Sequence, residues 1–239
     1  MKLKQIKNII LIILVIASKA KADIPVYSYS KMIWLGYFQQ IKLKKNYAIN
    51  TDLQFRTKDW FSNYSQALIR TGFVYNLNEK INLTIGMAHF RFFITNKSTR
   101  AEWRPWQEIS FNDQINKLSV KHRFRSEQRF NELLSDELEP TSHYSFNWRF
   151  RYKLELSYPI NNNETKKHFF TLANEIMINA GRLITTNYFD QNRFSIGFNF
   201  QLNESFYLQP QFIYINQFIK KSASLDNITV LRFNILHKI

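Results

Sequence analysis

The sequence predicts an all-β fold: an antiparallel up-and-down transmembrane β-barrel of 12 strands, with 10 strands as the alternative. Three observations lead to this prediction. The chain opens with a secretory leader, and almost every segment after residue 30 alternates between polar and apolar residues. The polar faces of the central segments also use arginine far more than lysine.

The first 22 residues have the order of a signal peptide. Lys2, Lys4 and Lys7 precede the apolar run 9–16, and Ala20 and Ala22 form a small-x-small cleavage site. The run is too short for a membrane-spanning helix, which needs about 20 apolar residues. We therefore predict a cleaved signal peptide over 1–22 and a barrel over 23–239, with an N-terminal membrane anchor as the alternative for the leader.

Charge and composition limit the classes of partner and site. The leader holds five lysines and no acids, so its removal lowers the formal net charge from +15 to +10. The remaining basic residues are not grouped in a tail or a helix, so we expect no nucleic-acid partner. The absence of cysteine excludes disulfides and cysteine metal sites, and we expect no metal and no cofactor.

Eleven segments carry the period-two pattern of a strand. In 143–158, for example, Phe146, Trp148 and Phe150 alternate with Arg149 and Arg151. Many segments hold about 14 residues, well above the five or six usual in soluble sheets and enough for a tilted membrane-spanning strand. In order, the segments are 31–43, 47–59, 64–77, 80–94, 100–115, 117–130, 143–158, 167–180, 188–202, 205–218 and 227–239.

The connections predict the topology. Short connections alternate with longer ones at 131–142, 181–187 and 219–226, as in outer-membrane barrels with short periplasmic turns and longer external loops. If the last strand ends in the periplasm, the segment 31–43 begins outside, and a further strand within 23–30 completes twelve. The loop 131–142 is acidic but lacks the spacing of a calcium loop, so we interpret it as a solvated loop.

Alternation does not decide which face points inward. A soluble lipocalin-like barrel places its apolar face inside, whereas a membrane barrel places it outside. The leader, the strand length and the preference for arginine favour the membrane barrel, because arginine suits confined, bidentate pairing better than lysine does. We therefore expect the polar faces to line a narrow lumen and the protein to lie in the bacterial outer membrane, in contact with lipid and lipopolysaccharide.

The expected lumen is rich in arginine and glutamate. One interpretation is a narrow pore or binding channel for small anions, because arginine exceeds acid. The alternative is a plugged barrel, filled by salt bridges, with a structural or adhesive role. An outer-membrane enzyme ranks third; His89 and His122 fall on apolar faces, no catalytic motif occurs, and we expect no catalytic residues. The candidate binding residues form a lumen ladder of Arg104, Glu108, Arg123, Arg125, Glu127, Arg129, Arg149, Arg151, Glu155, Glu175 and Arg193.

Several blocks of the sequence resemble one known family. They are "RAEWRPWQE" (100–108), "HRFRSEQRF" (122–130), "RFRYKL" (149–154), "ANEIMIN" (173–179) and "FDQNRFSIGF" (189–198). As a set they are similar to domain-of-unknown-function family 2490, bacterial proteins regarded as outer-membrane-like β-barrels. The resemblance covers nearly the whole chain after the leader. It implies the barrel fold and implies no particular activity.

Overall fold

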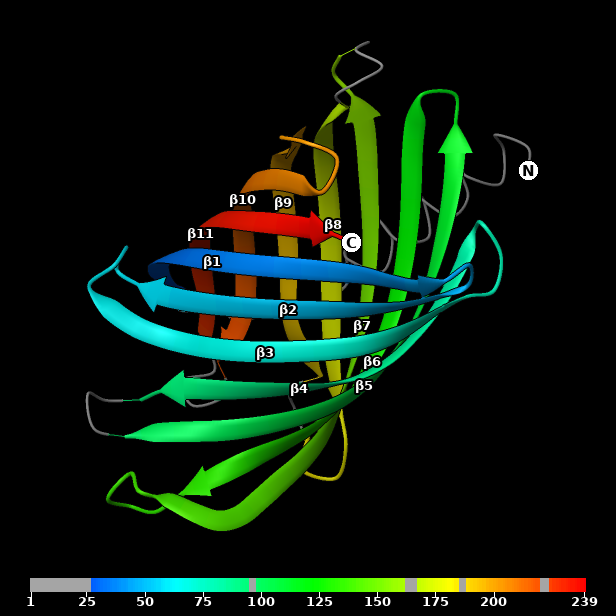
Figure 1. The fold of residues 1–239 in the computed structure, drawn as a ribbon. Helices are drawn as coiled ribbons and strands as arrows, with labels where there is room; N and C mark the ends of the chain where they lie inside the picture. The colour runs from blue at the N-terminus through cyan, green and yellow to red at the C-terminus, as the bar shows by residue number, and fades with distance from the viewer. Residues whose placement is uncertain (1–26, 95–97, 162–166, 185–187, 220–223) are drawn as a thin grey trace, which may run out of the picture.

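The fold is a closed β-barrel in which each strand pairs with the next along the chain and the last pairs with the first (Figure 1). It is seen in a computed structural model that describes residues 27–94, 98–161, 167–184, 188–219 and 224–239. Within these residues, no helix has the length and apolar character needed to cross a membrane. The strands are β1 (Tyr27–Lys44), β2 (Tyr47–Lys58), β3 (Asn63–Asn76), β4 (Ile81–Phe93), β5 (Thr99–Ile115), β6 (Leu118–Leu134), β7 (Pro140–Pro159), β8 (His168–Ala180), β9 (Phe189–Gln201), β10 (Phe206–Ile219) and β11 (Ser224–Lys238).

The barrel encloses its polar faces and exposes its apolar ones. In β2, Asp52 and Arg56 are 5% and 8% exposed, whereas Leu53 and Phe55 are 44% and 36% exposed. Because successive side chains of a strand point to opposite faces, the buried residues line the interior. This confirms the expected orientation and excludes the lipocalin-like arrangement. The outer surface is the apolar wall that a barrel surrounded by lipid requires.

The predicted numbers of strands, twelve and ten, are both wrong for the described residues, which form eleven. Tyr27–Ser30, where part of the twelfth strand was expected, are instead the first residues of β1, and residues 23–26 lie outside the described residues. β1 pairs directly with β11 in parallel, from Tyr27 with Leu225 to Gln40 with Lys238. This pairing gives both strands a second neighbour, so the barrel closes without an exposed edge. An odd number of strands makes the closing pair parallel.

One connection is much shorter than the sequence indicated. The expected loop 131–142 is mostly strand, because β6 continues to Leu134 and β7 begins at Pro140. A register shift between Glu132 and Leu134 accompanies this extension. β5 and β6 are joined by residues 116–117 alone, and Asn116 adopts a φ of 54° there. Asparagine tolerates this left-handed conformation better than most residues. The predicted signal peptide, 1–22, lies outside the described residues.

Candidate functional site

The structure places all eleven residues of the predicted lumen ladder on the inner faces of β5 to β9. The register brings opposite charges together on neighbouring strands. Glu108 lies opposite Arg125, Glu127 opposite Arg149, and Glu175 opposite Arg193. Cross-strand partners on one face have Cβ atoms about 5 Å apart, so such pairs are within reach of one another.

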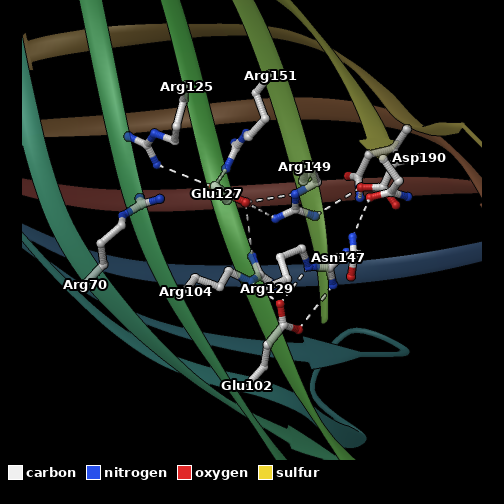
Figure 2. Close-up of polar contacts among 12 residues, drawn as sticks. Arg70, Glu102, Arg104, Arg125, Glu127, Arg129, Asn147, Arg149, Arg151 and Asp190 are labelled. Carbon is white, nitrogen blue, oxygen red and sulfur yellow. Dashed lines mark hydrogen bonds and ion pairs between the residues drawn. The ribbon is translucent and has the colours of Figure 1, made fainter. Parts of the chain in front are cut away.

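Glu127 lies at the centre of this network (Figure 2). Its carboxylate accepts hydrogen bonds from Arg149 Nη2 at 2.5 Å and from Arg151 Nη1 at 2.6 Å. Nitrogens of Arg104 and Arg125 lie 3.8 and 3.9 Å from the same carboxylate. Glu127 is 3% exposed, so one buried carboxylate faces four guanidinium groups in a confined space.

The other inward glutamates repeat this arrangement. Glu108 accepts a hydrogen bond from Arg125 Nε at 2.7 Å, and Glu175 pairs with Arg123 at 2.5 Å and with Arg151 at 2.8 Å. Each of these acids pairs with arginines on other strands. Charge-assisted hydrogen bonds of this kind are stronger than neutral ones, so they tie β5, β6, β7 and β8 together. Glu155 differs, because its ion pair is with Lys153 on its own strand.

Two inward residues outside the predicted ladder complete the network. Glu102, fully buried, pairs with Arg104 and accepts a hydrogen bond from Arg129 Nε at 2.7 Å. Asp190 pairs with Arg149 at 3.0 Å. Glu102 is an even number of residues from Arg104 and Glu108 on β5, so the period-two pattern places it on the same inward face. Asp190 is three residues from Arg193, and strict alternation would place it on the outer face. It points inward because the register of β8 and β9 shifts between Met177 and Ile178.

Aromatic rings on β4 and β5 pack against two of the inward arginines. The guanidinium carbon of Arg104 lies 3.6 Å from the centre of the Phe90 ring, and that of Arg125 lies 4.2 Å from the Trp106 ring. These distances are typical of cation–π contacts. Trp106 fits inside the barrel because it lies against Gly72 and Gly86, where any Cβ atom would come within 2.7 Å of the indole.

A cavity of about 690 Å³ lies beside the network inside the barrel. Its lining extends from Ser30 and Asp226, near one end of the barrel, to Asn199 and Gln209, near the other. Twelve arginine and lysine side chains line it, and the acids that line it are four: Glu155, Glu175, Asp190 and Asp226. Glu102, Glu108 and Glu127 lie behind their arginine partners and do not reach the cavity wall. The surface that faces the cavity is therefore strongly positive.

The two histidines considered as catalysts lie on the outer face. His122 Nδ1 is 2.9 Å from the Tyr152 hydroxyl, and the His89 ring packs against Trp103 with centroids 4.2 Å apart. Both are in the apolar band that surrounds the barrel, as the alternation predicted. The guanidinium groups that face the cavity are donors that can bind negative charge.

The family of the chain follows from a comparison of its sequence with family models. The model described as a protein of unknown function, DUF2490, matches residues 31–229. The chain belongs to the DUF2490 family. The match begins within β1 and ends within β11, so the family model covers nearly the whole barrel of this DUF2490 protein.

Solved structures similar to the DUF2490 chain include a porin and two receptors. The NanC porin is 11% identical, with 82% of this chain and 93% of that chain covered and a TM-score of 0.47. The siderophore receptor PirA from Pseudomonas aeruginosa is 10% identical, with 76% and 36% covered and a TM-score of 0.31. The ferric enterobactin receptor PfeA from the same organism is 11% identical in one mutant structure, with 74% and 35% covered and a TM-score of 0.34. No curated protein matches the chain.

Proposed function

We propose that this DUF2490 protein is an outer-membrane β-barrel whose lumen binds and passes small anions. The observation that carries the proposal is the charge of the cavity wall, where twelve basic side chains face four acidic ones. Fixed positive charge in a confined, low-dielectric space attracts anions and repels cations. Rings of arginine or lysine suit pores for anions.

The arrangement of the glutamates supports this proposal. Glu102, Glu108 and Glu127 hold the inward arginines in fixed orientations from behind. Arginine nitrogens that face the cavity keep donor capacity, because a guanidinium group has five N–H donors. The acids thus hold the site in shape while the excess of arginine keeps it positive. The length of the cavity along the wall is also consistent with passage from one end to the other.

A closed structural barrel is a second candidate, and the β5–β8 wall favours it. There the arginines and glutamates form ion pairs with one another, and Glu102, Arg104, Glu127 and Arg149 are each less than 7% exposed. Such a wall resembles a packed core more than a pore lining. In a barrel of this kind the cavity would bind anions without passing them.

Conductance of the refolded protein in a planar bilayer, under a potassium chloride gradient, tests the proposal. We expect steady channels whose reversal potential under this gradient has the sign expected when chloride is more permeant than potassium. Lys153→Gln, which removes a basic group from the lining, should move the reversal potential towards zero; Lys80→Gln, at the end of the barrel in an exposed ion pair, is the matched control. Folded protein without channels, or with cation-selective channels, would rule out an anion pore.

A further inference from the structure

One stretch of the inner wall is apolar. Buried side chains on three neighbouring strands form a continuous cluster, which we call the apolar strip: Met32 and Trp34 on β1, Ile228 and Val230 on β11, and Ile213 and Ile215 on β10. Met32, Trp34, Ile215 and Ile228 line the cavity. The passage of small inorganic anions does not require such a surface, because an apolar wall offers them no hydrogen bonds.

Three arginines border the apolar strip. Arg56 comes from β2 on one side and Arg193 from β9 on the other. Their guanidinium carbons lie 3.9 and 5.2 Å from the centre of the Trp34 ring. Arg232 is the register partner of Trp34 on β11. Positive charge therefore adjoins apolar surface at both edges of the strip.

These three arginines differ in their partners from the ladder arginines of β5 to β7, each of which pairs with a carboxylate. Arg56 donates to Gln54 Oε1 at 2.8 Å and to Gln66 Oε1 at 2.9 Å. Arg193 donates to Gln191 Oε1 at 2.6 Å, and Arg232 donates to Gln211. In the part of the chain that the structure describes, no carboxylate forms an ion pair with any of the three. Glutamine oxygens orient a guanidinium group without neutralising it, and an unneutralised buried charge is costly.

The same region holds buried polar atoms that lack partners. Trp34 Nε1, Arg232 Nε and Asn234 Oδ1 make no hydrogen bond with any described residue. Trp34 and Asn234 are only 3% and 2% exposed. Buried polar groups are nearly always paired in folded proteins, so unpaired ones call for an explanation. A bound molecule with an anionic oxygen would satisfy the two donors.

We propose that the cavity binds an amphipathic carboxylate, an organic acid with an apolar body. The carboxylate is held by Arg56, Arg193 and Arg232, whose planar forks match its two oxygens. The body lies on the apolar strip, where burial of apolar surface stabilises it. Ile219 and Phe92, which also line the cavity, extend its apolar lining beyond the strip. This inference rests on the proposed function in one respect, the positive potential of the lumen.

Isothermal titration of the full protein in lipid nanodiscs tests the proposal, with empty nanodiscs as the blank for partition into lipid. The probes are 4-phenylbutyrate, its uncharged amide, and butyrate, which lacks the aromatic body. We expect 4-phenylbutyrate to bind at least tenfold more tightly than either of the other two, since the loss of one charged hydrogen bond or of a buried ring costs about tenfold or more. Equal binding of butyrate and 4-phenylbutyrate would overturn the role of the apolar strip, and equal binding of the amide would overturn the role of the arginines.

Two variants locate the site. Arg193→Gln should weaken 4-phenylbutyrate about tenfold, whereas Lys121→Gln, which removes a basic group from β6 across the barrel, should weaken it far less, because it lowers the positive potential of the lumen without removing a group that contacts the ligand. Equal losses in both would mean that general charge, and not this site, binds the ligand. The ligand comparison needs no variant, so the test survives if Arg193→Gln fails to fold.

The two proposals can fail separately. If the barrel binds 4-phenylbutyrate but conducts no ions, the proposal that anions pass through the lumen is overturned and the carboxylate site stands. If the barrel forms anion-selective channels but shows no preference for 4-phenylbutyrate, the carboxylate site is overturned and the anion pore stands.

Discussion

At the scale of single residues, the charges around Glu127 determine how the wall of β6 and β7 is held together. Four arginines from three strands lie within 4 Å of its carboxylate. Two buried partners of opposite charge compensate for each other's loss of hydration, but only while both are present. Removal of the acid leaves several guanidinium groups buried near one another, and they then repel.

We expect Glu127→Gln to lower the free energy of unfolding by about 3–5 kcal/mol, the usual cost of breaking a buried ion pair by removing one partner. Glutamine keeps the shape and one acceptor, so the effect reports the charge. The midpoint of urea unfolding of the refolded barrel, followed by tryptophan fluorescence, measures the change.

Asp113→Asn is the matched control for this prediction. Asp113 pairs with Lys80 at 3.1 Å, but its side chain is 60% exposed at the end of β5. Solvent screens such pairs, so we expect no measurable shift of the urea midpoint. Equal midpoints for Glu127→Gln and Asp113→Asn would show that the inward network does not hold the barrel together.

At the scale of the strand, β3 and β4 leave room for the Trp106 indole. Gly72 and Gly86 are register partners, and Gly86 is also the partner of Trp106 on β5. A Cβ atom on Gly86 would lie 2.3 Å from the backbone oxygen of Thr71 and 2.6 Å from the indole. Backbone cannot move aside as a flexible side chain can, so this position admits only glycine without a shift of the sheet.

We predict that Gly86→Ala destabilises the barrel by about 1–3 kcal/mol, the range for overpacking a filled interior. Gly36→Ala should cost less, because the nearest atom to its new Cβ is Asn234 Oδ1, the end of a side chain. Thermal denaturation of both variants, followed by circular dichroism, compares the two. A Gly86→Ala variant as stable as Gly36→Ala would contradict this account of the Trp106 pocket.

The strands were well predicted from the sequence, and their irregularities were not. Period-two alternation located all eleven segments and separated the polar from the apolar face, because a two-faced strand leaves a direct trace in residue order. The leader, the strand length and the preference for arginine then indicated that the polar face points inward. The bulge that turns Asp190 inward cannot be recognised in the residue order, because it reverses the alternation of faces within a continuous strand. The extension of β6 and β7 into 131–142 was also missed, because the acids there favoured a loop over a strand.

At the scale of the whole molecule, the outer face implies a membrane environment. Exposed side chains such as Ile85, Ile69, Phe73 and Phe194 belong to the apolar band around the barrel, and each is more than 40% exposed. A soluble protein rarely exposes contiguous apolar surface of this extent. We expect the protein to fractionate with outer membranes and to change its electrophoretic mobility on heating in detergent. A soluble periplasmic product would contradict the membrane assignment.

The parallel pairing of β1 with β11 makes a separate prediction. Leu35 and Phe233 are register partners on the outer face, and the chain has no native cysteine. Leu35→Cys combined with Phe233→Cys should form a disulfide under mild oxidation, because adjacent strands place such pairs within reach. Leu35→Cys with Leu225→Cys should not, since Leu225 is the partner of Tyr27, eight residues away. Absence of the first cross-link would show that another segment separates the two strands.

The closure of the barrel could not be predicted from the residues. The alternation in connection length and the rule of even strand numbers favoured a twelfth strand before residue 31, yet Tyr27–Ser30 simply lengthen β1. Pairing between the first and last strands depends on backbone hydrogen bonds, and every residue except proline carries both a donor and an acceptor, so residue identity says little about this pairing. The same limit applies to the site. The period-two pattern grouped the arginines on the face predicted to point inward, but only the structure shows which of them have carboxylate partners.

The parallel pair also governs how the barrel would respond to force. Tyr27 and Lys238 lie at opposite ends of the β1–β11 pair. Tension applied between these two residues therefore loads the hydrogen bonds of the pair in shear, so that they resist together. In a barrel closed by an antiparallel pair, the two ends would be neighbours, and the same tension would open the bonds one after another. We therefore expect this barrel to be mechanically stronger when it is pulled at Tyr27 and Lys238 than an even-stranded barrel of similar size pulled at the corresponding residues of its first and last strands.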